Sequence, residues 1–438
     1  MPRPRVDLRT VWAIALGAAA MRLLLVWGLD LYADEAYYWL WAQRPAAGYF
    51  DHPPMVAWII ALSSAVLPGE PGVRVLFVAC GALAVVFAAL VASELSEDPR
   101  APAVGALLAA TSPLLVLTGA LALPDAPVEA AYAAGTWLVA RARGRAWAWA
   151  GVAVGLALLS KYTAALLAPA LLLLVLWDPE LRAELRTPWP WVGGAVAVGL
   201  FLPNLMWNAA HGWVAIAFQL GHGFGGTPTV RTFLEYLGGQ IGGAGPVVLA
   251  LGAWFLVRAR TSAARRVAAA SLVPLVVTVV SALRGPVEAN WGALAYPGLA
   301  GAAAAALVTA RPRVGRTLLG ASVALGLLAA AVFAYEVRRP TFAPVDSPLV
   351  AAARRAGAQP VLAACYPSNA AAGNGDCFPG TFLKPQKARA AMIASVTPPR
   401  VPARYVQRPG GLFHESEDDE GHRRPSDDQT GDEQGGQQ

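Results

Sequence analysis

Apolar stretches alternate with short polar segments along most of this 438-residue chain. Several stretches reach the roughly 20 apolar residues that a helix needs to cross a bilayer. Backbone groups in hydrocarbon must be satisfied within the segment itself, and a helix does this. The pattern therefore predicts an all-α polytopic integral membrane protein. Twelve apolar runs are visible, at 9–29, 53–67, 72–93, 103–121, 126–140, 147–160, 163–177, 190–206, 246–257, 267–283, 292–309 and 315–335.

Arginines gather in the segments that separate these runs, and cytoplasmic loops of membrane proteins are rich in Lys and Arg. The arginine-rich segments are the N-terminus and residues 141–145, 182–186, 258–266 and 311–316. These segments can share one side only if one run between residues 30 and 141 does not cross.

The best candidate is the run at 53–67, which is short for a span, opens with Pro53 and Pro54, and ends at Pro68-Gly69. We interpret it as an interfacial or re-entrant helix of the first outer loop. The prediction becomes about eleven crossings, with the N-terminus in the cytoplasm of a cell whose inner membrane holds the chain.

Composition supports a membrane protein, since 56% of the residues are hydrophobic and 14% are charged, against roughly 25% charge in soluble domains. The net charge of +6 arises from arginines in the short loops beside the apolar runs, where they set the membrane topology. No nucleic-acid partner is therefore expected. Residues 1–340 form the expected transmembrane domain. Residues 341–410 read as a short extracytoplasmic segment of unclear structure, and 411–438 as an acidic, disordered tail.

Under this topology most polar chemistry falls on the outer face. The segments concerned are 30–52, the turn at Pro124-Asp125, 207–245 and 284–291, together with Lys161. No phosphate-binding loop or zinc-type Cys/His cluster is present. An enzyme of this kind would take a donor that arrives through the membrane.

Two pairs of ionisable residues mark the first outer loop. Asp34 precedes Glu35. Asp34 could be a general base or the N-cap of an interfacial helix with Glu35 in its first turn, and the two roles are compatible. Asp51 and His52 could bind a cation or a phosphate, or cap the helix that the following prolines open.

The remaining outer positions also have two readings. Asp125 caps a helix or holds a metal or sugar, and Lys161 either snorkels or contacts a lipid phosphate. Arg231 and Arg284 oppose the positive-inside trend, and Arg284 could instead pair with Glu288. Tyr296 is an aromatic anchor in the plain reading.

These residues together resemble the polyprenyl-phosphate-dependent glycosyltransferases of the GT-C fold. The resemblance is to the bacterial branch related to dolichyl-phosphate-mannose–protein mannosyltransferases and lipid A aminoarabinose transferases. It rests on five motifs in order, which are Asp34-Glu35-x-Tyr37-Tyr38, Tyr49-Phe50-Asp51-His52-Pro53-Pro54, Leu123-Pro124-Asp125, Ser160-Lys161-Tyr162-Thr163, and Asn290-Trp291 leading into Ala295-Tyr296-Pro297.

The resemblance implies a role for each matched position. Asp34 takes the catalytic acidic position, and Lys161 matches a lysine near the donor phosphate. Arg231 and Arg284 would be further phosphate contacts. The expected substrate cavity is lined by Glu35, Asp51, His52, Asp125 and Tyr296.

Two details of this assignment concern ions. His52 stands where some relatives carry a phosphate-binding lysine, so its phosphate role departs from the pattern. Asp51 and Asp125 are the candidates to hold a divalent cation, the one cofactor expected.

The implied activity is transfer of a sugar from a polyprenyl-phosphate-linked donor to an extracytoplasmic lipid, protein or glycan, with inversion at the anomeric carbon. A transporter or flippase of a lipid-linked sugar is the alternative. It would place ionisable groups near the bilayer midplane and show repeat symmetry. A non-catalytic scaffold, in which the acidic residues only cap helices, is a third reading.

Overall fold

The computed structural model describes residues 6–224, 227 and 229–338, and the predicted segments 341–410 and 411–438 lie outside this range. The described residues form helices and their connections. The helices are α1 (Leu8–Val26), α2 (Ala33–Ala42), α3 (Met55–Val66), α4 (Gly69–Leu95), α5 (Ala101–Ala110), α6 (Pro113–Thr118), α7 (Asp125–Arg141), α8 (Ala146–Ser160), η1 (Tyr162–Leu166), α9 (Leu167–Trp177), α10 (Pro179–Glu184), α11 (Trp189–Ala210), α12 (Val214–Phe224), α13 (Val230–Ala244), α14 (Pro246–Leu256), α15 (Ser262–Ala282), η2 (Ala289–Ala295), α16 (Tyr296–Thr309) and α17 (Pro312–Arg338).

Six of these helical segments are long and apolar enough to cross a membrane, which makes the chain a multi-pass membrane protein. They are α1, α4, α11, α15, η2 with α16, and α17. A seventh span results if α13 and α14, which meet at 93°, are counted together. Four further apolar segments are shorter than a typical span. They are α3, α5, α8, and η1 with α9.

Small side chains form the centre of the bundle. The window of η2 and α16 that could cross the membrane is 89% buried, and α16 packs against α4, α5 and α14. Helices in lipid associate closely where small residues let their backbones approach. At the crossing of α8 and α11, a Cβ atom on Gly151 would lie only 2.1 Å from the carbonyl oxygen of Gly193.

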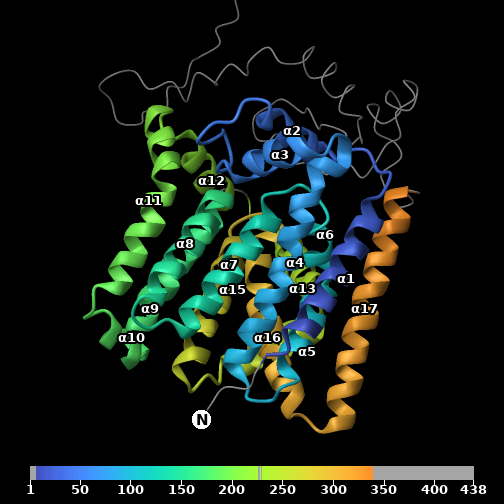
Figure 1. Cartoon of the computed structure of the whole chain (residues 1–438), viewed down its shortest axis with the longest axis vertical. Helices are drawn as coiled ribbons and strands as arrows, with labels where there is room; N and C mark the ends of the chain where they lie inside the picture. Colours follow the sequence, from blue (N-terminus) through green and yellow to red (C-terminus); the bar gives the residue numbers. More distant parts are fainter. Residues whose placement is uncertain (1–5, 225–226, 228, 339–438) are drawn as a thin grey trace, which may run out of the picture. The chain divides into compact units, whose positions relative to one another are not determined.

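The arginine-rich segments lie together at one end of the bundle, as the charge pattern predicted (Figure 1). Arg143, before α8, pairs with Glu180 of α10 at 2.8 Å. Arg266 of α15 pairs with the buried Asp178 at 2.7 Å. These bonds join three loops that the sequence assigns to the cytoplasm.

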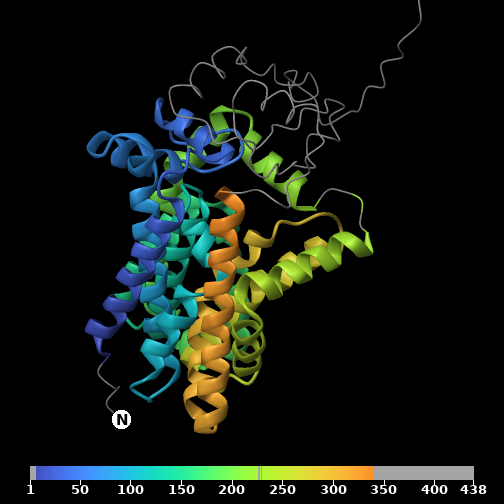
Figure 2. The ribbon, with the colours of Figure 1, turned by 90° about the vertical axis from the view of Figure 1, so that its right-hand side faces the viewer.

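The opposite end carries α2 and α3, which lie side by side across the ends of the longer helices (Figure 1). The segment 207–245, expected as an outer loop, instead contains two helices, α12 and α13. Figure 2 shows α13 directed away from α14 at their shared bend. The polar segments at this end enclose the candidate site.

Candidate functional site

The structure brings Lys161 and Asp125 into direct contact. Lys161 has an extended backbone between α8 and η1, and Asp125 is the first residue of α7 after Pro124. Lys161 Nζ donates to Asp125 Oδ1 at 2.8 Å, and both side chains are buried. The break between α8 and η1 therefore places the Lys161 ammonium beside Asp125 at the start of α7.

Glu35 is fully buried and attaches α2 to the helices beneath it in the bundle. Its carboxylate accepts bonds from Arg74 Nε at 2.8 Å and Arg74 Nη2 at 2.6 Å. It also accepts the backbone N–H groups of Tyr32 and Ala122, each at 2.9 Å. The carboxylate thus joins α2, α4 and the turn before α7, while a contact with substrate stays a prediction.

Asp34, the neighbour of Glu35, lies in the first turn of α2 and is partly exposed. Its charge acts on Asp51 of the same loop and on Glu288, which precedes η2. Asp34 is therefore electrostatically coupled to one carboxylate in its own loop and to another that lies far away in the sequence.

The loop between α2 and α3 holds Asp51 in place. Tyr37 donates its hydroxyl to Asp51 Oδ1 at 3.3 Å, and Gln219 of α12 donates to the Asp51 carbonyl at 2.6 Å. Burial raises the pKa of Asp51 to about 7, and the charge of Asp34 adds to this effect. The His52 ring lies beside Tyr38, with their ring centroids 5.9 Å apart.

Glu288, which the sequence offered only as one possible partner of Arg284, lies within electrostatic range of Lys161, Asp125 and Asp34. Burial raises its pKa; Lys161 acts against this effect, while Asp125 and Asp34 add to it. Its place just before a helix that carries Asn290-Trp291 was the available signal.

An amide cluster was also missed. Asn204 and Asn208 are fully buried on α11, where Asn208 Nδ2 donates to the Tyr162 hydroxyl at 3.1 Å and Tyr162 donates to Asn204 Oδ1 at 3.2 Å. Asn204 Nδ2 reaches the Ala47 carbonyl at 2.9 Å. Two asparagines four apart in an apolar helix share one face, which could have identified them.

The other predicted site residues are Tyr296, Arg231 and Arg284, and the first two bond to residues outside this group. The buried Tyr296 donates to Gln240 Oε1 at 2.9 Å. Arg231 pairs with Glu235 one turn along α13 at 2.7 Å, on an exposed surface, and Arg284 is exposed. Phosphate contacts by the two arginines and a cavity role for Tyr296 stay predictions.

Metal binding by Asp51 and Asp125 also stays a prediction. Over residues 6–224, 227 and 229–338, no three His, Cys, Asp or Glu side chains are grouped so as to hold a metal ion. Asp125 directs an oxygen to Lys161, and Asp51 directs one to Tyr37.

The family resemblance is confirmed by comparison with known proteins. Residues 51–207 match the family model described as dolichyl-phosphate-mannose-protein mannosyltransferase. The lipid A galacturonosyltransferase RgtD of Rhizobium johnstonii is 27% identical over 301 residues, covering 65% of this chain and 62% of the relative.

The fold is that of ArnT from Cupriavidus metallidurans. Its crystal structures in the apo state and bound to undecaprenyl phosphate each superpose with a TM-score of 0.59 and 19% identity. Each superposition covers 73% of this chain and 64% of ArnT. This chain therefore spans less than two thirds of the length of either relative.

Proposed function

We propose that this chain, a relative of the dolichyl-phosphate-mannose-protein mannosyltransferases over residues 51–207, is a membrane glycosyltransferase that uses a polyprenyl-phosphate sugar donor. The observation that carries the proposal is the buried pair of Lys161 and Asp125. The charges of this pair influence the pKa of Glu288, and the charge of Asp34 influences it as well. An ammonium among carboxylates suits a reaction in which phosphate leaves while a hydroxyl loses its proton.

Lys161 is the proposed phosphate-binding group. An oxygen of the acceptor attacks the anomeric carbon, the bond from that carbon to the phosphate oxygen breaks, and the electron pair stays on polyprenyl phosphate. A cation placed where this negative charge develops stabilises the transition state. Arg231 and Arg284 are the proposed supplementary contacts, and they would have to approach the donor from their exposed positions.

Asp34 is the proposed general base, and it takes the proton of the attacking hydroxyl. Attack opposite the departing phosphate inverts the anomeric configuration. Asp51, His52, Asp125 and Tyr296 would orient the sugar, with a divalent cation at Asp51 and Asp125 as the untested addition. Glu35 would act mainly by holding α2, because Arg74 and two backbone N–H groups already occupy its oxygens.

We propose lipid A, or a similar lipid on the outer face of the inner membrane, as the acceptor. The support is the similarity to RgtD, which is named for galacturonosyl transfer to lipid A. Binding of undecaprenyl phosphate to ArnT supports the choice of donor carrier. The donor and acceptor would meet at the end of the bundle that carries α2 and α3.

The proposed topology has eleven crossings with the N-terminus inside. Seven come from the long apolar helices and the bent pair of α13 and α14. The segments α5 with α6, α7, α8, and η1 with α9 would supply four more. They are shorter than a typical span, so neighbouring helices rather than lipid would cover much of their surface.

The test is release of polyprenyl phosphate by the purified full chain. The assay supplies undecaprenyl-phosphate-linked galacturonic acid and lipid A, and then other lipid-linked sugars. Asp34→Asn should lower turnover by about 100-fold or more, since a general base contributes about 10² to 10⁴. Lys161→Met should also lower turnover, whereas the distant, exposed Arg313→Gln should not.

Two results would overturn the proposal. Normal turnover of Asp34→Asn would remove the proposed base. Movement of an intact lipid-linked sugar across proteoliposomes, with none of the donors cleaved, would identify a flippase instead.

A further inference from the structure

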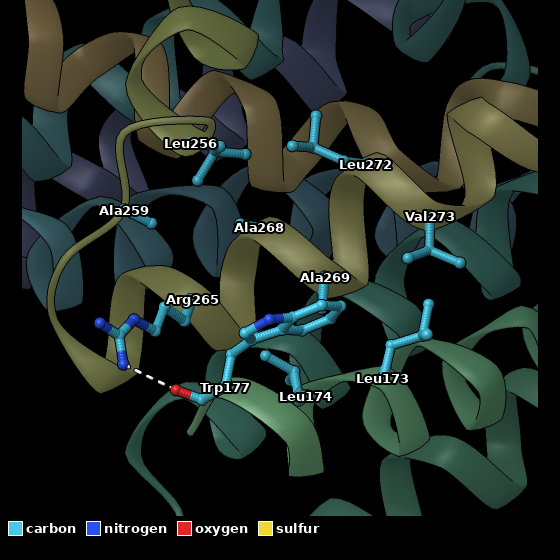
Figure 3. Close-up of a pocket in the computed structure, with 10 residues that line it drawn as sticks. All are labelled: Leu173, Leu174, Trp177, Leu256, Ala259, Arg265, Ala268, Ala269, Leu272 and Val273. Carbon is cyan, nitrogen blue, oxygen red and sulfur yellow. Dashed lines mark hydrogen bonds between the residues drawn. The ribbon is translucent and has the colours of Figure 1, made fainter. Parts of the chain in front are cut away.

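A cavity of about 410 Å³ lies at the arginine-rich end of the bundle, away from the candidate site. Helices α9 and α15 form its walls, with Leu256 at the end of α14 and the following Ala259 (Figure 3). Nearly all the lining side chains are apolar, and Arg265 is the charged one. An apolar cavity with a cation on its wall suits an amphipathic ligand.

The cavity is polar at one end and apolar at the other. Arg265 and Trp177 meet where Arg265 Nη1 donates to the Trp177 carbonyl at 2.8 Å (Figure 3). Val273 lies eight residues farther along α15, about 12 Å deeper at 1.5 Å per residue. Leu173 lies one turn deeper on α9. The exposed Trp177 marks the interfacial level, where tryptophan is enriched in membrane proteins.

The surface around this polar end carries excess positive charge. Asp178 is already paired with Arg266, and Glu180 is paired with Arg143. Arg258 and Arg260 are exposed in the segment between α14 and α15. Basic pockets between helices at the cytoplasmic surface attract anionic lipid headgroups.

We infer that this cavity binds one acyl chain of an anionic phospholipid from the cytoplasmic leaflet, with the lipid phosphate at Arg265. The chain would run past Leu272 toward Leu173 and Val273, parallel to α9 and α15. This site is independent of the proposed sugar transfer, because Lys161 lies at the other end of η1 and α9.

The experiment measures quenching of Trp177 fluorescence by brominated lipid in the reconstituted full chain. Vesicles contain phosphatidylcholine with an equal mole fraction of dibrominated phosphatidylglycerol or dibrominated phosphatidylcholine. Subtracting the signal of Trp177→Phe isolates this tryptophan from the others. We expect about fivefold preferential binding of the anionic lipid, the effect of one arginine near a charged headgroup.

Two variants, each with a matched control, separate the site from general contact with the bilayer. Arg265→Gln should equalise quenching by the two lipids, while Arg313→Gln, at an exposed position in the first turn of α17, should preserve the difference. Val273→Phe should fill the deep end and reduce quenching. The control Val276→Phe changes an exposed residue of the same helix that does not line the cavity, and it should have no effect.

Two outcomes would overturn the inference. Equal quenching of the wild-type chain by the two lipids would show no headgroup preference. Relief of quenching by undecaprenyl phosphate at concentrations where phosphatidylglycerol is ineffective would assign the cavity to the carrier's hydrocarbon chain. Neither outcome would alter the turnover expected from Asp34 and Lys161.

Discussion

Individual charged residues inside this apolar bundle are held by specific partners. Arg22, Arg74 and Arg266 are among the largest fully buried side chains. Arg74 bonds Glu35 and the carbonyls of Leu29 and Asp30, and Arg22 donates to the Leu115 carbonyl. Breaking a buried pair leaves an uncompensated charge, which is costlier than losing the pair entirely.

This asymmetry gives a prediction for the anchor of α2. Arg74→Met should destabilise the protein by about 3 to 5 kcal/mol, because Glu35 would stay buried without its partner. The double variant Arg74→Met/Glu35→Gln should recover part of this loss. Thermal unfolding in detergent, followed by circular dichroism, would measure both, and a double variant less stable than Arg74→Met would contradict the idea.

Asp51 should make stability depend on pH. Burial raises its pKa from 3.8 in the unfolded chain to about 7 in the folded protein. The folded state therefore retains a proton that the unfolded chain has released, and this contribution is lost as pH rises from about 4 through 7. Asp51→Asn has no carboxyl group to titrate at this position. The difference in melting temperature, variant minus wild type, should therefore become more positive as the pH rises from 5 to 8. A constant difference across this range would contradict the shifted pKa.

The sequence identified the residues of the site more readily than their partners. Placing Asp34, Asp51, Asp125 and Lys161 at one end needed only the charge pattern and the lengths of the apolar runs. The contact of Lys161 with Asp125 depends on how α7 and η1 pack, which one-dimensional spacing does not contain. The electrostatic coupling of Glu288 to Lys161 depends on packing in the same way, and spacing along the chain suggested only Arg284 as its partner.

At the scale of helices, the apolar runs located most elements but not their interruptions. The run at 103–121 is divided into α5 and α6 at Ser112-Pro113, since proline opens a new first turn. The segment at 207–245 was read as a loop because its glycines and polar residues lower its hydropathy. In α13, however, Val230, Leu234, Leu237 and Ile241 form an exposed apolar stripe with helical spacing.

The close crossing of α8 and α11 gives a prediction with an adjacent control. A Cβ atom on Gly193 would lie 2.4 Å from the Trp147 carbonyl oxygen, while one on Gly194 meets nothing within 4 Å. Gly193→Ala should lower the melting temperature because the helices must separate. Gly194→Ala should leave it unchanged or raise it, since alanine favours helix by up to about 1 kcal/mol. Equal effects of the two variants would contradict the packing.

For the whole molecule, charge patterning predicted which loops share an end of the bundle. The ion pairs among Arg143, Glu180, Asp178 and Arg266 join loops far apart in sequence. Asn204 and Gln219 join α11 and α12 to the first loop at the other end. The number of crossings was harder to fix, because four proposed spans are short or broken.

Orientation in the cell can be tested with single cysteines in a chain whose native cysteines are replaced. Arg44 and Arg260 are exposed at opposite ends. A membrane-impermeant maleimide should label Arg44→Cys in intact spheroplasts and Arg260→Cys only after permeabilisation. The reverse pattern would place the candidate site in the cytoplasm, and labelling of both in intact spheroplasts would contradict the opposite-end arrangement.

The last described helix returns to the first, where Arg338 donates to the carbonyls of Leu24, Leu25 and Trp27. The end of the described part of the chain therefore lies beside the C-terminal end of α1 rather than beside Leu8, where α1 begins. Under the proposed topology, a reporter enzyme inserted after Arg338 is expected on the side of the membrane proposed to supply the acceptor, while a tag before Leu8 is expected on the opposite side. Capture through the tag before Leu8 would leave the proposed reaction face clear, whereas a probe after Arg338 would lie at the edge of that face.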